Sequence, residues 1–139
     1  MRKNDPIKNL MSEDLQSVQK GQPLSEVFKI LQSNNIHHVA VLDGKKLVGV
    51  VSYTDLMQIS LGVQGYDSDQ LWPTIDAQHE LIDVMTASPT TLNHAGVVRD
   101  AAEALSTGAY HSLPVTDDAG ELVGMITSTD LIRYLIDQY

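Results

Sequence analysis

The sequence predicts an α+β fold built from two pseudo-symmetric β-α-β-β-α units. The first observation is a repeated phrase: residues 47–56 read LVGVVSYTDL and residues 122–131 read LVGMITSTDL. The second is that a shift of 74 or 75 residues aligns most of the remaining chain. The third is the alternation of short apolar runs with longer helix-like stripes in each half. A period this long indicates duplicated supersecondary units, each too small to bury a core alone.

The elements follow the same order in both halves. Pro23 suits the first position of a helix that ends near Asn34, because apolar residues recur between them at helical spacing. The apolar runs 39–42 and 47–51 flank a turn, as expected for a pair of adjacent strands. The second half repeats this pattern, and its first helix is expected to close at Gly108. Each unit therefore reads as strand, helix, strand, strand and helix.

A polar segment separates the two halves. We expect a first repeat over residues 1–61, a linker over 62–80 and a second repeat over 81–139. The linker is rich in turn formers, which predicts a long connection that packs only in part. Trp72 within it is expected to anchor the linker on the domain, since a large aromatic side chain is more often an anchor than a ligand platform.

Composition argues against several classes of function. The chain has no cysteine, which excludes disulfides and thiol catalysis. It has no run of eighteen apolar residues that would span a membrane, and its first residues lack a secretory signal, so we expect a cytoplasmic protein with no membrane partner. The formal net charge of −9 argues against a nucleic-acid partner, which would require a clustered positive surface.

Enzyme chemistry finds little support in the sequence. The phosphate-binding patterns G-x-x-x-x-G-K-[ST] and G-x-G-x-x-G are absent, as is a G-x-S-x-G nucleophile elbow. His37 and His38 are neighbours on an expected strand, where adjacent side chains point to opposite faces and do not easily chelate one metal. The remaining histidines have no ligand spacing. We therefore expect no catalytic residue, no metal and no cofactor.

The repeated phrase predicts a strand that turns into a helix, twice. Thr54 and Thr129 are suited to cap these helices through their hydroxyl oxygens. An aspartate follows each of them in the first turn, where the helix dipole favours negative charge. A further hydroxyl stands three residues before each aspartate, at Ser52 and Thr127. The cap alone leaves this hydroxyl unexplained, whereas a site in which Asp55 or Asp130 binds the paired hydroxyls of a ribose would use it as a further polar contact.

These motifs resemble a known family. Two copies of Gly-apolar-apolar-[Ser/Thr]-x-x-Asp, with Leu10-Met11 and Val84-Met85 near the unit starts and an apolar strand at 113–115, resemble the tandem cystathionine-β-synthase (CBS) domain pair, as in a stand-alone Bateman module. The resemblance covers nearly the whole chain except the linker. It implies two units packed through their sheets, with clefts that bind adenine nucleotides (AMP, ADP or ATP) or an adenosyl compound such as S-adenosylmethionine.

The resemblance also implies which residues line the clefts, each of which would be shared between the units. The first cleft would hold Val50, Ser52, Thr54, Asp55, Ser88, Asn93, Tyr110 and His111. The second would hold Gln19, Ile36, His37, His38, Met125, Thr127, Thr129, Asp130 and Arg133, with Asp14 beside them. His38 stands where a basic residue is more usual, Asp14 would oppose a phosphate, and Arg133 could either reach a phosphate or lie on the surface.

Two functions of different classes remain open at this stage. The first is a regulatory module that senses an adenosine-containing ligand, and the second is a ligand-free scaffold for protein interaction or dimerisation. The helices that begin at Asp55 and Asp130 carry more apolar residues than one small module can cover, so we expect a homodimer. No effector domain is recognisable in the sequence, so any output would pass to a separate effector protein.

Overall fold

The computed structural model describes residues 4–13, 15–63, 65 and 68–139, and these form two compact units. Unit 1 combines the N-terminal residues up to Leu15 with Thr90–Tyr139, and unit 2 is Gln16–Pro89. Both units contain strand, helix, strand, strand and helix in that order, which confirms the predicted α+β class with two pseudo-symmetric β-α-β-β-α units.

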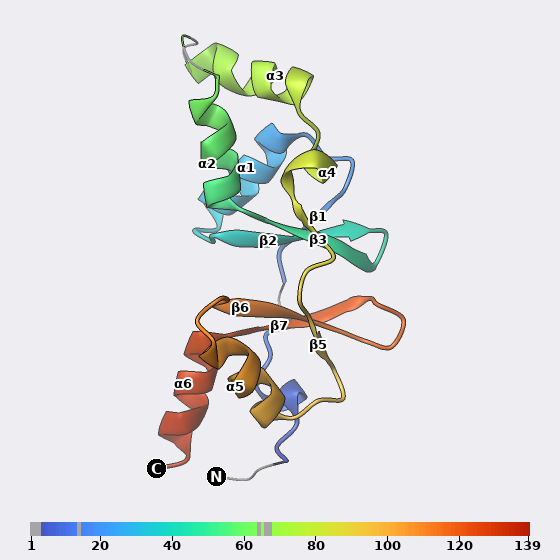
Figure 1. The fold of residues 1–139 in the computed structure, drawn as a ribbon, viewed down its shortest axis with the longest axis vertical. Helices are drawn as coiled ribbons and strands as arrows, with labels where there is room; N and C mark the ends of the chain where they lie inside the picture. Colours follow the sequence, from blue (N-terminus) through green and yellow to red (C-terminus); the bar gives the residue numbers. More distant parts are fainter. Residues whose placement is uncertain (1–3, 14, 64, 66–67) are drawn as a thin grey trace. The chain divides into compact units, whose positions relative to one another are not determined.

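Unit 2 is a four-stranded sheet with its helices on one face (Figure 1). Its elements are β1 (Ser17–Gln19), α1 (Leu24–Ser33), β2 (His38–Asp43), β3 (Lys46–Ser52), α2 (Tyr53–Leu61), α3 (Ser68–Gln78), α4 (Leu81–Val84) and β4 (Thr86–Ala87). The strand order is β1-β2-β3-β4, with β1 parallel to β2 and the other pairs antiparallel. Apolar side chains of α1, β2 and β3 form the core beneath the helices.

The segment expected to be a long, partly packed connection contains the eleven-residue helix α3. Ile75 on α3 is fully buried in the core of unit 2. Trp72 stacks on Phe28 of α1 with ring centroids 4.5 Å apart, which confirms its expected role as an anchor. Asp76 accepts hydrogen bonds from the backbone N–H and the hydroxyl of Ser25, at 3.0 and 2.5 Å. The sequence pattern did not predict this helix, because it has few apolar residues and its stability comes from tertiary contacts.

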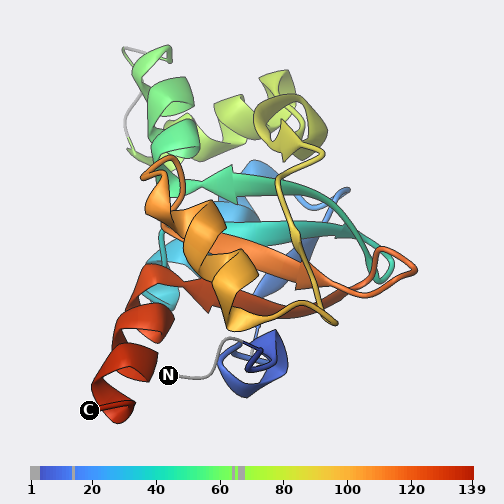
Figure 2. The same ribbon diagram turned by 60° about the horizontal axis from the view of Figure 1, so that its bottom comes forward.

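Unit 1 repeats the arrangement with a three-stranded sheet (Figure 2). Its elements are the 3₁₀ helix η1 (Ile7–Asn9), β5 (Leu92–Asn93), α5 (Val98–Ser106), β6 (Ser112–Thr116), β7 (Leu122–Thr127) and α6 (Ser128–Asp137). Strand β5 is parallel to β6, and β6 is antiparallel to β7. Buried residues of α5, β6 and β7 form its core, together with Ile7 from the N-terminal segment.

The segment that opens each repeat packs into the unit built by the other repeat. Ser12 and Met125 exchange two backbone hydrogen bonds of 2.9 and 3.0 Å in unit 1. In unit 2, Thr86 on β4 pairs with Val50 on β3 in the same way. A Cβ at Gly124 would collide with the side chain of Met11, so the missing side chain makes room for this segment. The compact units and the sequence repeats therefore differ in where they begin.

The ends of the first helices deviate little from the sequence prediction. Pro23 is the N-cap of α1, so the helix begins at Leu24, one residue later than predicted. Helix α1 ends at Ser33 with Asn34 as its C-cap, close to the expected end, and the next residue, Asn35, has a φ of 52°. Helix α5 ends before Gly108, whose φ of 77° suits a residue without a side chain.

Candidate functional site

The two repeated phrases form the same hydrogen-bonded turn between a strand and a helix. In unit 2, the hydroxyl of Ser52 accepts from the N–H of Asp55 at 3.0 Å, and Oδ2 of Asp55 accepts from the N–H of Ser52 at 2.9 Å. In unit 1, Thr127 and Asp130 make the corresponding bonds at 3.0 and 2.8 Å. Each pair is a reciprocal capping box that fixes the orientation of the aspartate.

This geometry corrects the expected roles of the hydroxyls. Ser52 and Thr127 are the N-caps, whereas Thr54 and Thr129 lie inside the first turn and are exposed. The prediction that the two threonines cap the helices was therefore wrong. The hydroxyl three residues before each aspartate was taken as a sign of a ligand, but the capping box accounts for it without one.

The capping box leaves a defined set of polar groups at each turn. In the first turn of α2, the N–H of Tyr53 donates to the carbonyl of His37 at 2.8 Å and the N–H of Asp55 donates to Ser52. Among the described residues, the N–H and hydroxyl of Thr54 and Oδ1 of Asp55 have no hydrogen-bond partner. An acceptor and two donors therefore lie together at the end of β3.

The turn of unit 1 offers the same set of groups. The N–H of Ser128 donates to the carbonyl of His111 at 2.9 Å, and the N–H of Asp130 donates to Thr127. The N–H and hydroxyl of Thr129 and Oδ1 of Asp130 remain without a partner within the described part of the chain. A carboxylate oxygen beside a donor N–H suits a ligand that carries paired hydroxyls.

The structure places one histidine at each turn of its own unit. His37 lies at the start of α2 and His111 at the start of α6, each through its backbone carbonyl. His38 pairs with Ser52 across β2 and β3, and Ser112 takes the corresponding position opposite Thr127. Both His37 and His111 are exposed.

Two other predicted residues lie at the opposite end of their sheets. The side chain of Gln19 exchanges hydrogen bonds of 2.9 and 3.0 Å with Gly44 in the β2–β3 turn. The amide of Asn93 donates to Asp118 in the β6–β7 turn at 3.2 Å, and its oxygen accepts from the N–H of Ala95 at 2.9 Å. Within their own units, both side chains are therefore occupied by turns that lie away from the aspartates.

The remaining predicted residues lie beside the strands or helices of their own units. The N–H of Ser88 donates to Val48 at 3.4 Å, and Ser88 has a φ of 49°. The hydroxyl of Tyr110 lies 3.0 Å from that of Thr90. Ile36 packs partly buried against the core of unit 2. Val50 and Met125 pair with the segment that opens the other repeat, and Asp14 lies outside the described residues.

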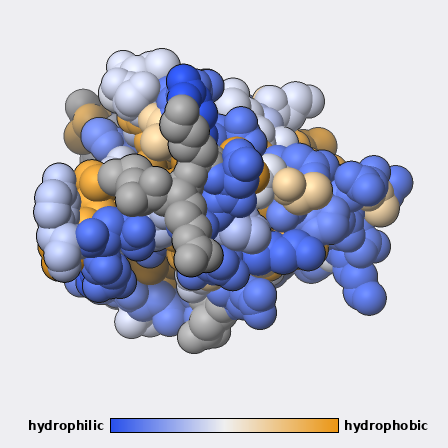
Figure 3. Space-filling model, turned by 90° about the horizontal axis from the view of Figure 1, so that it is seen from below, coloured by the Kyte–Doolittle hydropathy of each residue, from blue (hydrophilic) through white to orange (hydrophobic). Residues whose placement is uncertain are grey.

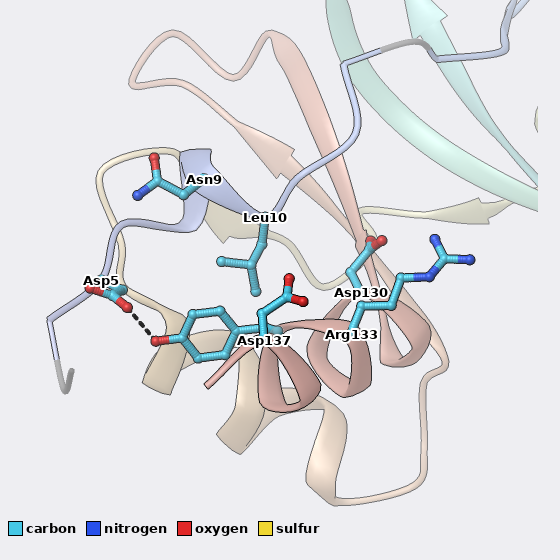
Figure 4. A pocket seen from close by; sticks show the side chains of 7 residues that line it. Asp5, Asn9, Leu10, Asp130, Arg133 and Asp137 are labelled. Atoms are coloured by element: carbon cyan, nitrogen blue, oxygen red, sulfur yellow. Dashed lines mark hydrogen bonds between the residues drawn. The ribbon is translucent and has the colours of Figure 1, made fainter. Parts of the chain in front are cut away.

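A pocket of about 220 Å³ lies in unit 1 between the N-terminal segment and α6 (Figure 4). Its lining residues are Asp5, Asn9, Leu10, Asp130, Arg133, Tyr134 and Asp137. The hydroxyl of Tyr134 donates to the carboxylate of Asp5. Asp130 and Arg133 were predicted from the sequence. The others were not, and the available signal was the spacing of three and four residues that places Asp130, Arg133 and Asp137 along one side of α6.

The described residues contain neither a candidate membrane span nor a candidate metal site. No helix among them is long and apolar enough to cross a membrane. No group of three or more histidine, cysteine, aspartate or glutamate side chains in the described ranges could hold a metal ion.

Comparison with known proteins identifies the family. The sequence profile of the CBS domain matches residues 7–62 and 81–137. The chain therefore belongs to the CBS domain family, with two copies of the domain, as the repeated motifs indicated.

Two curated relatives show how far the similarity extends. The chain is 32% identical over 139 residues to the chloroplastic CBS domain-containing protein CBSX1 of Arabidopsis thaliana, covering 87% of this chain but 59% of that protein. It is 30% identical over 133 residues to the CBS domain-containing protein DDB_G0289609 of Dictyostelium discoideum, covering 94% of this chain and 90% of that protein. The chain thus spans about three fifths of the plant relative and most of the other.

Solved structures share the fold. Arabidopsis thaliana CBSX2 in complex with AMP superimposes with a TM-score of 0.79 at 24% identity, covering 96% of this chain and 98% of that one. The CBS domain pair of protein MJ0100, in complex with 5′-methylthioadenosine and S-adenosyl-L-methionine, gives a TM-score of 0.76 at 23% identity, covering 98% and 99% of the two chains. At these identities, the similarity establishes the fold alone.

Proposed function

We propose that the protein is a non-catalytic regulatory module that senses an adenosine-containing ligand. The observation that carries the proposal is the duplicated turn, in which a capping box fixes an aspartate while Oδ1 and a neighbouring N–H have no partner among the described residues. A ribose presents paired hydroxyls that can donate hydrogen bonds to such a carboxylate oxygen. Preorganised polar groups bind more tightly because little conformational freedom is lost on binding.

Two similar structures support the class of ligand. CBSX2 was crystallised with AMP, and the MJ0100 domain pair with 5′-methylthioadenosine and S-adenosyl-L-methionine. All three compounds contain adenosine and differ in the group attached to the ribose. We therefore assign Asp55 and Asp130 to the ribose, and Arg133 to an anionic group of the ligand.

The other residues predicted from the sequence stay proposed ligand contacts: Ser88, Asn93, Tyr110, His111, Gln19, Ile36, His37 and His38. The hydrogen bonds of Gln19 and Asn93 within their own sheets leave these two side chains the weakest members of the set.

We further propose a homodimer formed through α6. No residue of this helix is buried, and Ile132, Leu135 and Ile136 are 57%, 40% and 65% exposed. Figure 3 shows hydrophobic residues at the surface among hydrophilic ones. The three residues follow helical spacing, so they form one stripe that two copies could bury against each other in an isologous contact.

The same stripe supports a second candidate function, a scaffold whose only activity is protein association. Exposed apolar side chains gathered on one helix are typical of interaction surfaces. A separate effector protein and a cytoplasmic location both stay predictions from the sequence. A bound adenosine compound is what distinguishes the sensor from the scaffold.

A thermal-shift panel with AMP, ADP, ATP, S-adenosylmethionine and 5′-methylthioadenosine tests the proposal. A ligand present at 100 times its dissociation constant stabilises the folded state by about 2.7 kcal/mol, which is readily measured. Guanosine and cytidine monophosphates serve as controls for the base. If no adenosine compound raises the melting temperature at millimolar concentration, the sensor is wrong and the scaffold remains.

A further inference from the structure

Two side chains of opposite charge in the pocket of unit 1 do not form a salt bridge with each other. Arg133 and Asp137 lie four residues apart on α6, both line the pocket, and both are exposed. They form no salt bridge, although Arg99 and Glu103, with the same spacing and the same order on α5, pair at 2.9 Å. In Figure 4, Asp137 extends toward Leu10, while Arg133 extends beside Asp130. A cationic and an anionic side chain therefore flank the same hollow without a salt bridge between them.

We propose that the ligand held at Asp130 carries a zwitterionic amino-acid group, which binds in this pocket. This inference rests on the proposed function, because it takes Asp130 as the ribose contact. The guanidinium of Arg133 binds the carboxylate of the amino-acid group with its planar fork. The carboxylate of Asp137 accepts hydrogen bonds from its ammonium group. Side chains four residues apart on a helix begin about 5–6 Å apart, which lets them flank the two adjacent charged groups of an amino acid.

The other charges in the pocket favour this ligand over a nucleotide phosphate. Three carboxylates line the pocket against one guanidinium. Asp5 already accepts a hydrogen bond from Tyr134, and Oδ2 of Asp130 accepts one from Thr127, but both keep their negative charge near the hollow. A phosphate would meet these charges in addition to Arg133, whereas a group with no net charge meets an opposite partner for each of its own charges.

The size of the pocket suits a part of a ligand. Sites for whole small molecules enclose about 300–1,000 Å³. The pocket of unit 1 has about 220 Å³, and Leu10 contributes an apolar wall. It therefore has room for a short aliphatic chain that ends in two charged groups, while the nucleoside lies outside it at the turn of Asp130.

The turn of Asp55 lacks both charged partners. A shift of 75 residues places Gln58 where unit 1 has Arg133, and Gly62 where it has Asp137. The two turns share the capping box and the free polar groups, so the difference lies in what each can bind beyond the ribose. The turn of Asp55 is therefore indifferent to the amino-acid group, and selectivity for it belongs to the turn of Asp130 alone.

Calorimetry on the full chain compares four adenosine compounds. S-adenosylmethionine and S-adenosylhomocysteine carry the amino-acid group, 5′-methylthioadenosine lacks it, and AMP replaces it with phosphate. We expect the first two to bind the Asp130 turn about tenfold more tightly than the others, since hydrogen bonds to charged groups are among the stronger ones. S-adenosylhomocysteine has the amino-acid group but no sulfonium charge. If it binds with the same affinity as S-adenosylmethionine, the preference is due to the amino-acid group.

Two variants with matched controls locate the effect. Arg133→Gln and Asp137→Asn should each weaken S-adenosylhomocysteine about fivefold and leave 5′-methylthioadenosine unchanged. Arg99→Gln and Glu103→Gln remove the same charges from the paired site on α5 and should change neither.

Three outcomes would overturn the inference. Equal affinity for all four compounds would show that the pocket does not recognise the amino-acid group, while the proposed adenosine sensor would stand. If AMP binds most tightly of the four, and Arg133→Gln weakens it, the arginine binds a phosphate and not an amino-acid group. Binding of none of the four removes both the inference and the sensor on which it rests.

Discussion

The hydroxyl of Thr127 accepts a hydrogen bond from the N–H of Asp130 at 3.0 Å, and the carboxylate of Asp130 accepts one from the N–H of Thr127 at 2.8 Å. The carboxylate that we assign to the ribose is therefore also part of the capping box that stabilises the start of helix α6. A substitution of Asp130 can change both the stability of the protein and its affinity for the ligand, so an experiment must measure the two separately.

Thr127→Val should lower the free energy of unfolding by about 1 kcal/mol, because it removes the N-cap acceptor while keeping the shape of the side chain. Chemical denaturation measures the change. Thr129→Val is the control, since Thr129 is exposed and makes no cap, and it should stay within about 0.5 kcal/mol of the natural protein. Equal losses in the two variants would contradict the assignment of Thr127 as the cap.

Asp130→Asn should weaken an adenosine ligand about tenfold, since a hydrogen bond to a charged group contributes about 1.5–3 kcal/mol. Asparagine keeps a side-chain oxygen that can accept from the N–H of Thr127, so the unfolding free energy should change little. Asp130→Ala removes both roles and should lower affinity and stability together. Calorimetry and denaturation on the two variants separate the roles, and unchanged affinity in Asp130→Asn would remove the carboxylate from the ribose site.

The duplication made the fold predictable from the sequence. Two copies of one pattern, in register over both halves, fix the order of strands and helices more firmly than either copy alone. The strand-to-helix turns and the first-turn positions of Asp55 and Asp130 were predicted correctly for this reason. The cap was assigned to the wrong hydroxyl because Ser52 and Thr54 both fit a cap by residue type, and only the backbone conformation decides between them.

Two features depend on contacts that no local pattern reveals. Helix α3 has few apolar residues, and it is stabilised by Trp72 and Ile75 against the core of unit 2. The exchange of opening segments joins Ile7 to residues more than eighty positions later in the chain. The pocket beside α6 depends on the same exchange, since Asp5 and Leu10 supply one of its walls.

Trp72→Ala should lower the free energy of unfolding by about 3 kcal/mol, the lower part of the range for truncating a large aromatic side chain. The reason is the loss of the stacked contact with Phe28. Trp72→Phe keeps an aromatic ring at the site and should recover most of the loss. A change below 0.5 kcal/mol in Trp72→Ala, which is about the effect of a neutral surface substitution, would mean that α3 contributes little to unit 2.

Ile136→Asp should convert the proposed dimer into a monomer. It places a charge in the exposed apolar stripe of α6, where a second copy would bury it without a partner. Light scattering at micromolar concentration gives the mass directly. Ile82→Asp is the matched control, because Ile82 is 47% exposed on α4 and lies outside the stripe. A natural protein that is monomeric, or an Ile136→Asp variant that stays dimeric, would contradict the role of α6.

Ile7→Ala tests whether the N-terminal segment is an integral part of unit 1. Ile7 is fully buried, its N–H donates to the carbonyl of Gly96 at 3.0 Å, and its side chain belongs to the core cluster of the unit. Truncating a buried isoleucine costs about 2–5 kcal/mol in a packed core. A segment that only rests on the surface would lose less than about 0.5 kcal/mol, as at ordinary exposed positions.

Leu81→Ala is the matched variant in unit 2, because a shift of 74 residues relates Leu81 to Ile7 and its side chain is 1% exposed. The exchange of opening segments is reciprocal, so the two substitutions should lower the free energy of unfolding by similar amounts. Lys8→Ala changes an exposed neighbour of Ile7 and should have little effect. Chemical denaturation of the three variants decides the matter: a large loss for Leu81→Ala with none for Ile7→Ala would mean that unit 1 is complete without its N-terminal segment.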